Sequence, residues 1–282
     1  MCTISLEPGL LWFNQGVSKF LKANSISYDV TRKRLVLQIA NMVARSGEGH
    51  IPSALSILDI VYAVYDYEYS LGNNLKQIDF VLSKGHGAAA LYVVLNEFGV
   101  IPKVALDEYC QSGGALMGHP EINEEFGIRA STGSLGHGFP IAVGLALGNK
   151  ILDRIKTTYV VIGDGEANEG TIWESLILVS ALKITNLICF LDNNLSTERA
   201  IPVGNWTEKF KSFGWNVLSV DGHDLNEIKK VISEKAENFP TIVITNTVKG
   251  RGLKDLENNP SWHHRTPTSS ELQTFESELN QN

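Results

Sequence analysis

The chain contains 282 residues, of which 43% are hydrophobic and 20% charged, and its formal net charge is −7. This composition indicates a globular protein with a sizeable core, and the negative charge argues against a nucleic-acid-coating protein. The apolar stretches are too short for a transmembrane span, and the first residues lack the pattern of a signal peptide. Cys2, Cys110 and Cys189 show no paired spacing, which favours a reduced, cytoplasmic setting.

The first third of the sequence predicts a leader segment followed by helices. Residues 1–27 are assigned to the leader, whose apolar group at 10–13 favours packing on the protein surface. Helical spacing or apolar runs then predict three helices, at 32–43, 54–65 and 88–98. A glycine-rich break is expected between the first two.

Strands and helices alternate along the second half. Short β-branched or apolar runs predict strands, which are expected at 159–162, 187–191, 215–220 and 241–247. Longer apolar or amphipathic segments predict helices at 171–182 and 225–236. This order predicts an α/β fold with a doubly wound, mainly parallel sheet and helices on both faces. Ligands of such sheets bind beyond the carboxyl ends of the strands, so functional residues are expected just after these ends.

A Gly-Asp-Gly turn and an asparagine pair each follow an expected strand, at Gly163-Asp164-Gly165 and Asn193-Asn194. The carboxylate of Asp164 and the amide oxygen of Asn194 suit Mg²⁺, which also binds phosphates. Gly165 lets a phosphate approach the free N–H groups that begin a helix. A lone Gly-Asp-Gly is most often only a turn, so the predicted metal-bridged diphosphate site depends on the whole strand–turn–helix–strand–Asn order. No dinucleotide or Walker A motif is present.

All seven histidines stand beside a glycine or another histidine: His50, His86, His119, His137, His223, His263 and His264. Such neighbours place imidazole on loops, where it can donate to anionic oxygens or move protons near neutral pH. Any single one is more often structural than functional. Zinc is disfavoured because the sequence has no H-x-x-x-H or C-x-x-C pair. Glu169 is either a first-turn acid favoured by the helix dipole or a buried acid in a proton network.

Several motifs occur in a specific order between about residue 28 and residue 271. They are Phe80-Val81-Leu82-Ser83-Lys84-Gly85-His86-Gly87, Gly118-His119-Pro120-Glu121, Thr132-Gly133-Ser134-Leu135-Gly136, Gly163-Asp164-Gly165 with Glu169-Gly170, Asp192-x-Asn194, Asp221-Gly222-His223-Asp224 and Lys249-Gly250-Arg251-Gly252. This series resembles the transketolase family, and more narrowly the N-terminal subunit of split transketolases.

The resemblance implies that residues 28–282 form a thiamine diphosphate-binding domain. It implies Mg²⁺, or another divalent cation such as Ca²⁺ or Mn²⁺, held by the side chains of Asp164 and Asn194 and the backbone oxygen of Ser196. The implied cofactor contacts are His86, Gly133, Leu135, Asp164, Gly165, Glu166, Asn194 and His263. The implied catalytic residues, which bind sugar hydroxyls, move protons or link active sites, are His50, His86, His119, Glu169 and His263.

The sequence departs from the family pattern around the first of these histidines. The usual Gly-Ser-Gly-His is Gly47-Glu48-Gly49-His50 here, and the following Pro-Gly-Gly-Ser is Ile51-Pro52-Ser53-Ala54. His137 replaces a usual Gln, and Ile78-Asp79 replaces a usual Asp-Arg. A carboxylate at Glu48 accepts hydroxyl hydrogen bonds and repels anions, so these changes are expected to affect sugar specificity rather than cofactor binding.

The resemblance also implies a reaction and a partner. A transketolase transfers a two-carbon ketol unit from a ketose or ketose phosphate to an aldose, and its cofactor supports the carbon–carbon cleavage. In full-length relatives, a glutamate in a second domain activates the cofactor, and the match does not include that domain. A separate C-terminal subunit with the pyrimidine-binding domain is therefore expected as a partner, in an α2β2 heterotetramer. The chain is expected to be active only together with this partner.

Three alternatives remain open from the sequence. The alpha subunit of a 2-oxo-acid dehydrogenase also has a Gly-Asp-Gly and an Asn, but it does not need the histidines at 50, 86 and 119. A non-catalytic cofactor-binding scaffold is a second alternative, although Asp164, Asn194 and Glu169 are all present. A transketolase-like enzyme of specialised or branched sugar biosynthesis is the third, favoured by the altered loop before His50.

Overall fold

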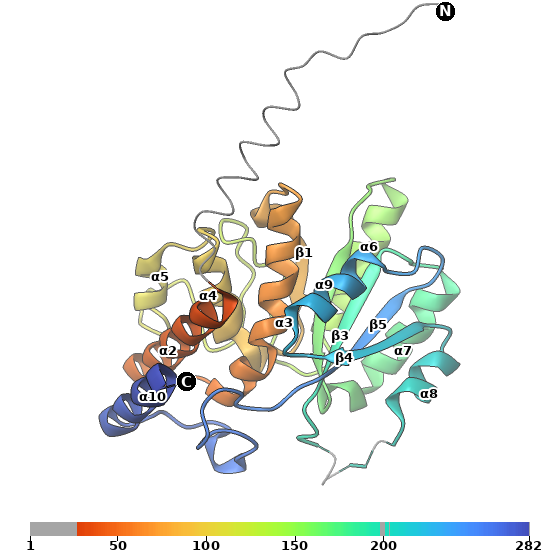
Figure 1. The fold of residues 1–282 in the computed structure, drawn as a ribbon. Helices are drawn as coiled ribbons and strands as arrows, with labels where there is room; N and C mark the ends of the chain where they lie inside the picture. Colours follow the sequence, from red (N-terminus) through yellow and green to blue (C-terminus); the bar gives the residue numbers. More distant parts are fainter. Residues whose placement is uncertain (1–26, 198–200, 203, 282) are drawn as a thin grey trace, which may run out of the picture.

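The computed structural model describes residues 27–197, 201–202 and 204–281 (Figure 1). Its sheet consists of β1 (Asp79–Leu82), β2 (Thr158–Gly163), β3 (Leu187–Asn193), β4 (Asn216–Asp221) and β5 (Thr241–Asn246). The strands lie in the order β1-β2-β3-β5-β4, and every neighbouring pair is parallel. All carboxyl ends therefore meet at one edge, which confirms the predicted parallel α/β sheet and places the expected ligand edge.

Helices cover both faces of this sheet. One face carries α2 (Tyr28–Ser46), α3 (Ile51–Ser70), α4 (Ala88–Glu97) and α9 (Leu225–Ser233), and the other carries α6 (Gly138–Ile151), α7 (Gly170–Ala181) and α8 (Trp206–Ser212). Successive residues of a strand point to opposite faces, so Tyr159 and Val161 join the first core while Val160 and Ile162 join the second. The prediction of a doubly wound fold is confirmed.

Shorter elements complete the described chain. They are α5 (Lys103–Asp107) and the single-turn helices η1 (Leu75–Gln77), η2 (Gly85–Gly87), η3 (Glu166–Asn168) and η4 (Pro260–Trp262). The final helix, α10 (Ser269–Gln281), packs beside α2, so the two ends of the described chain lie together in Figure 1.

Most predicted elements are present, with ends that differ by a few residues. The largest extension is α3, which begins at Ile51 and includes Pro52, since proline is tolerated in the first helical turn. Strand β1 and the helices α5, α6, α8 and α10 were not predicted. Strand β1 has only four residues, and α6 contains three glycines and a proline, which are weak helix formers. Packing against the sheet stabilises α6 despite this composition.

The predicted leader lies outside the described residues apart from Ser27. The Ser27 hydroxyl oxygen accepts a hydrogen bond of 3.3 Å from the N–H of Asp29 and so caps α2. Among the described helices, none combines the length and the apolar character needed to cross a bilayer.

Candidate functional site

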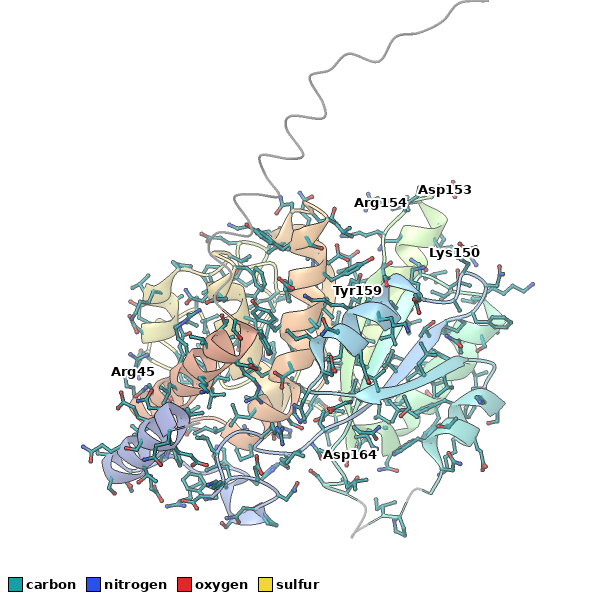
Figure 2. The ribbon with its side chains drawn as sticks, viewed as in Figure 1. Arg45, Lys150, Asp153, Arg154, Tyr159 and Asp164 are labelled. Carbon is teal, nitrogen blue, oxygen red and sulfur yellow. The ribbon has the colours of Figure 1, made fainter. Side chains whose placement is uncertain are left out.

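The predicted functional residues gather where the parallel strands end. Figure 2 shows Asp164 at this edge, while Asp153 and Arg154 lie at the opposite edge of the sheet. Asp164 follows β2 directly and Asn194 follows β3, and these two strands are hydrogen-bonded neighbours. The N–H of Asp164 also donates to the backbone oxygen of Asp192 at 3.2 Å, which ties the two strand ends together.

The carboxylate of Asp164 is buried and partly satisfied by backbone donors. It accepts hydrogen bonds from the N–H of Gly165 at 2.8 Å and from the N–H of Thr197 at 3.4 Å. Burial raises its pKa above the ordinary range, Lys84 acts in the opposite direction, and Asp192 adds to the rise. A carboxylate destabilised by burial in this way gains more than an exposed one from a bound cation.

Asn194 presents its amide oxygen to Ser196, in the loop that follows β3. Its amide nitrogen donates to the carboxylate of Asp192 at 2.9 Å and to the hydroxyl of Ser56 at 3.0 Å. Its amide oxygen accepts from the N–H and the hydroxyl of Ser196, the former at 3.0 Å. The structure therefore brings the three predicted metal residues, Asp164, Asn194 and Ser196, into adjoining loops.

A fully buried carboxylate, Asp192, lies directly behind these loops. It forms an ion pair with Lys84 and accepts hydrogen bonds from Ser56, Thr247 and Asn194. Paired in this way, the buried charge is compensated, and it anchors residues that follow β1, β3 and β5. Neither Asp192 nor Lys84 has a predicted role from the sequence, although both stand within motifs of the resemblance.

The four histidines predicted to be catalytic come together in space. The ring centroid of His50 lies 4.3 Å from that of His86, 5.4 Å from His263 and 5.7 Å from His119. Burial and the neighbouring imidazoles lower the pKa of His50 to about 3, and burial followed by His119 lowers that of His86 to about 4. Both rings are therefore uncharged at neutral pH, which is the form that accepts protons and hydrogen bonds.

Glycines allow the loops of this site to pack closely. A Cβ atom at Gly85 would lie 2.8 Å from the backbone of Gly133, and one at Gly133 would lie 3.0 Å from the His119 ring. Gly133 also has a φ of +130°, which side-chain-bearing residues rarely adopt. Leu135, two residues on, is 38% exposed and is free to contact a ligand.

The two predicted glutamates of the β2–α7 loop lie in different environments. Glu166 is buried and accepts hydrogen bonds from the hydroxyl of Ser83 and from the N–H groups of Gly136 at 3.0 Å and Gly163 at 3.2 Å. Burial raises its pKa. Glu169 is exposed in this chain at the start of α7, so its interpretation as a buried acid does not apply to the single chain. The buried acids of this loop are Asp164 and Glu166.

Two residues of later motifs also belong to this region. Lys249 follows β5, and its ammonium lies 3.3 Å from Nδ1 of His263, while burial and the charge of Lys84 lower its pKa. His223 is structural: it bridges the carboxylate of Asp59 at 2.7 Å and the N–H of Val248 at 2.9 Å. His223 thus holds the loop that carries Lys249. No role was predicted for Lys249 from the sequence. The signal that could have identified it is its place in the Lys-Gly-Arg-Gly motif, which follows a predicted strand.

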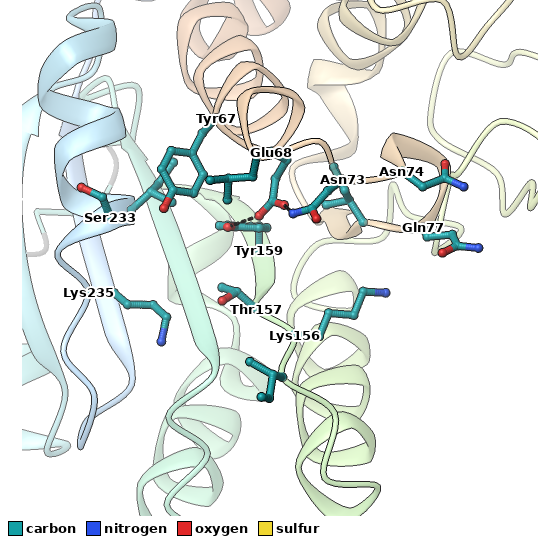
Figure 3. A pocket seen from close by; sticks show the side chains of 14 residues that line it. Tyr67, Glu68, Asn73, Asn74, Gln77, Lys156, Thr157, Tyr159, Ser233 and Lys235 are labelled. Atoms are coloured by element: carbon teal, nitrogen blue, oxygen red, sulfur yellow. Dashed lines mark hydrogen bonds between the residues drawn. The ribbon is translucent and has the colours of Figure 1, made fainter. Parts of the chain in front are cut away.

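A cavity of about 380 Å³ lies at the opposite edge of the sheet, lined by α3, α9 and the start of β2 (Figure 3). Its polar groups bind one another: Glu68 accepts hydrogen bonds from Tyr159 and Asn73. Lys156 on its rim pairs with Asp79 at 2.7 Å. The converging hydrogen-bond donors and the uncharged His50 and His86 lie instead at the carboxyl ends of the strands, so we place the functional site at that edge.

The residues of this edge fit a diphosphate cofactor with a divalent cation. Asp164 and Asn194 supply hard oxygen ligands, and Lys249 supplies a positive charge beside them. A Cβ at Gly165 would lie 2.7 Å from Thr197, so only glycine lets these two loops approach each other. Uncharged imidazoles next to them can donate to anionic oxygens and exchange protons.

Comparison with known proteins matches residues 29–280 to the family described as "Transketolase, thiamine diphosphate binding domain". A protein of Phocaeicola vulgatus that is named as an apulose-4-phosphate transketolase subunit is 34% identical over 253 residues, which cover 86% of this chain and 88% of that protein. The 6-deoxy-6-sulfo-D-fructose transketolase subunit SqwG of a Clostridium species is 33% identical over 255 residues, which cover 84% and 90%.

The fold is also that of a solved transketolase. The crystal structure of transketolase from Campylobacter jejuni is similar with a TM-score of 0.79 and 27% identity, covering 88% of this chain and 42% of that one. The family match decides against the alpha subunit of a 2-oxo-acid dehydrogenase. With matches over nearly its whole length, the chain belongs to the transketolase family and corresponds to its N-terminal, thiamine diphosphate-binding subunit.

Proposed function

We propose that this chain holds thiamine diphosphate and a divalent cation for a two-subunit transketolase, which transfers a two-carbon ketol unit from a ketose or ketose phosphate to an aldose. The single observation that carries the proposal is the placement of Asp164 and Asn194 beside a group of histidines, among them the uncharged His50 and His86, at the carboxyl edge of the sheet. Residues 28–282 form the cofactor-binding domain in this proposal.

The described residues divide the binding of the cofactor among them. Asp164, Asn194 and the backbone oxygen of Ser196 hold Mg²⁺, or Ca²⁺ or Mn²⁺ in its place. The diphosphate contacts Gly165, His86 and His263, with Lys249 as an added partner, while Gly133 and Leu135 meet the rings. Glu166 braces these loops from inside through its bonds to Gly136 and Gly163. When bound, thiamine diphosphate supplies a nucleophilic carbon and an electron sink for carbon–carbon cleavage.

The histidines of this chain handle the sugar in the proposed reaction. His50, His86, His119 and His263 bind hydroxyl groups and exchange protons with them, because imidazole nitrogens can both accept and donate hydrogen bonds. Their close spacing fixes the orientation of the sugar relative to the cofactor, which lowers the entropic cost of the reaction.

A partner subunit completes the site. The chain covers 88–90% of relatives named as transketolase subunits but only 42% of the Campylobacter transketolase. Helices α6 and α7 expose apolar side chains, with Ile141 at 41%, Ile177 at 56% and Leu178 at 47% exposed, which suits a contact between subunits. We therefore propose a partner, a C-terminal subunit with the pyrimidine-binding domain, in an α2β2 assembly. A cytoplasmic location is proposed separately, from the unpaired cysteine spacing of the sequence. Glu169, at the exposed start of α7, links the active sites in this assembly.

The test of this function is reconstitution. The chain is purified alone and with a candidate C-terminal subunit, and ketol transfer is measured with thiamine diphosphate and Mg²⁺. We expect turnover only in the mixture, and none with Asp164→Asn. Robust turnover by the single chain contradicts the need for a partner, and cofactor binding without turnover in every mixture supports the scaffold alternative instead.

A specialised sugar substrate is a second candidate, favoured by one contact. The carboxylate of Glu48 lies 3.2 Å from Nε2 of His264, whose ring lies 4.7 Å from that of His50. The unusual Glu48 thus stands at the rim of the histidine group and presents a negative charge there. The Phocaeicola and Clostridium relatives are named for apulose 4-phosphate and a sulfonated fructose, so unusual sugars occur among related members of this family.

A further inference from the structure

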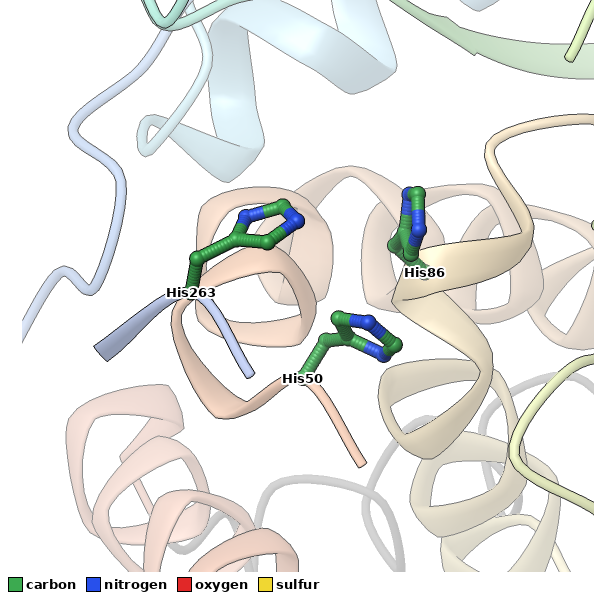
Figure 4. A group of neighbouring side chains, drawn as sticks. All are labelled: His50, His86 and His263. Carbon is green, nitrogen blue, oxygen red and sulfur yellow. The ribbon is translucent and has the colours of Figure 1, made fainter. Parts of the chain in front are cut away.

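Three histidines from distant parts of the chain converge closely enough to share one ion. His50 precedes α3, His86 lies in η2, and His263 follows η4 (Figure 4). One ligand nitrogen from each ring lies within 4.8 Å of the other two. The ring centroids of His50 and His263 are 5.4 Å apart, and those of His86 and His263 are 5.5 Å apart.

One nitrogen of this cluster lacks a hydrogen-bond partner. Nδ1 of His50 is buried and receives or donates no hydrogen bond within the described chain. A buried polar atom in this state is costly, and a bound ion or ligand removes the cost. Burial also lowers the pKa of all three imidazoles, which favours their uncharged form, and only an uncharged imidazole has a free lone pair for a metal ion.

We propose that His50, His86 and His263 form a second cation site, which binds a late first-row transition ion such as Zn²⁺ with water in the fourth position. This site differs from the Asp164–Asn194 site in its donors: three nitrogens favour zinc, whereas carboxylate and amide oxygens favour magnesium. Ligand nitrogens on one tetrahedral zinc ion lie about 3.4 Å apart, so binding draws the rings inward by about 1 Å.

Occupancy of this site by zinc has a functional consequence, which rests on the proposed function. The same three rings are assigned to the sugar and the diphosphate, and a bound zinc ion makes their lone pairs unavailable. The chain thereby separates divalent ions by their ligand preference: oxygen-preferring ions support the cofactor, and nitrogen-preferring ions block the channel.

Binding of zinc to the full chain without cofactor tests the proposal. Zn²⁺ is titrated by calorimetry, and Co²⁺ is used as a spectroscopic probe because its visible absorption is strong in tetrahedral nitrogen sites and weak in octahedral oxygen sites. We expect His50→Gln, His86→Gln and His263→Gln each to weaken binding at least about 10-fold. His264→Gln is the matched control, since this neighbouring ring faces Glu48, and Asp164→Asn is the control for the oxygen site. Neither control is expected to change zinc binding.

Two outcomes overturn the proposal: zinc affinity that is equal in the wild type and the three histidine variants, or zinc binding that disappears in Asp164→Asn. Circular dichroism checks the fold of each variant, and if one variant is unfolded the other two decide. Binding of thiamine diphosphate with Mg²⁺ is measured separately on the wild-type chain. The proposed function fails if this binding is absent, whereas the zinc proposal fails only on the zinc titrations.

Discussion

The amide nitrogen of Asn194 donates a hydrogen bond of 2.9 Å to the buried carboxylate of Asp192, and this bond determines the direction of the Asn194 amide oxygen. Asp192 is itself held by its ion pair with Lys84, the residue before the η2 turn. The orientation of a predicted metal ligand thus depends on a buried charge pair behind it. Removing a group that orients a metal ligand in this way commonly weakens metal binding by about 10- to 100-fold.

The first prediction concerns this ion pair. Asp192→Asn leaves the buried ammonium of Lys84 without its carboxylate, and we expect the free energy of unfolding to fall by about 3–5 kcal/mol. Urea unfolding of the single chain measures the change. The control is Asp107→Asn, which removes the exposed pairs with Lys103 and Arg45 and changes stability by less than about 1 kcal/mol. Equal stability of the two variants contradicts the assigned role of Asp192.

The second prediction separates function from stability at Asp164. Burial raises the pKa of this carboxyl, so the folded chain holds its proton more tightly than the unfolded chain does. Ionisation at neutral pH therefore costs stability when no metal is bound. Asp164→Asn is expected to abolish metal-dependent cofactor binding while leaving the metal-free chain equally or more stable.

Calorimetric titration and thermal unfolding at pH 7 measure these two properties. Asp153→Asn, at the opposite edge of the sheet, is the control and is expected to retain cofactor binding. Retained metal-dependent binding in Asp164→Asn contradicts the site assignment, and a large loss of stability contradicts the electrostatic argument.

The third prediction is a pH dependence caused by the buried histidines. The pKa values of His50 and His86 are about 3 and about 4 in the folded chain, whereas an unfolded histidine titrates near about 6.5. Below that pH the unfolded state takes up protons that the folded state does not, so stability falls as the pH drops towards 4. The double variant His50→Gln/His86→Gln is expected to lose less stability over this range. Urea unfolding at pH 4, 5, 6 and 7 tests this, and parallel curves for the two proteins contradict it.

The fourth prediction concerns close backbone packing at Gly133. Gly133→Ala introduces a Cβ at an unfavourable φ and 3.0 Å from the His119 ring, so we expect a loss of about 1–3 kcal/mol and weaker cofactor binding. Gly144→Ala is the control, because a Cβ at this helical glycine meets nothing within 4 Å. That change is expected to be neutral or to stabilise by up to about 1 kcal/mol. A Gly133→Ala chain as stable as the wild type contradicts the predicted strain.

The fifth prediction tests the substrate class through Glu48 and rests on the proposed function. Its carboxylate favours neutral, hydroxyl-rich groups near His50 and repels anionic ones. Glu48→Ser in the reconstituted enzyme is expected to change the ratio of kcat/KM for anionic over neutral substrates by about 10-fold, in favour of the anionic ones. Glu276→Ser on α10 is the control. An unchanged ratio assigns the specificity to the partner subunit instead.

The sequence alone determined the fold class and the edge of the sheet where the site lies. Alternating strands and helices with short connections leave few arrangements other than a parallel doubly wound sheet, and ligands bind at the carboxyl ends of its strands. Asp164 and Asn194 were predictable for this reason, because each stands within three residues of the end of a predicted strand. Helix α6 was not predictable, since its glycines oppose a helix locally and only contacts with β1 and β2 stabilise it.

Only the tertiary structure decided which charges and rings meet. The Lys84–Asp192 pair joins residues 108 positions apart, and His50 and His263 come from opposite ends of the described chain. Local spacing argued against a histidine metal site, because ligands on one helix or hairpin leave a short-range pattern and ligands on separate loops do not. Burial, which lowers the pKa of His50 and raises that of Asp164, likewise follows from the packing of whole helices on the sheet rather than from neighbouring residues.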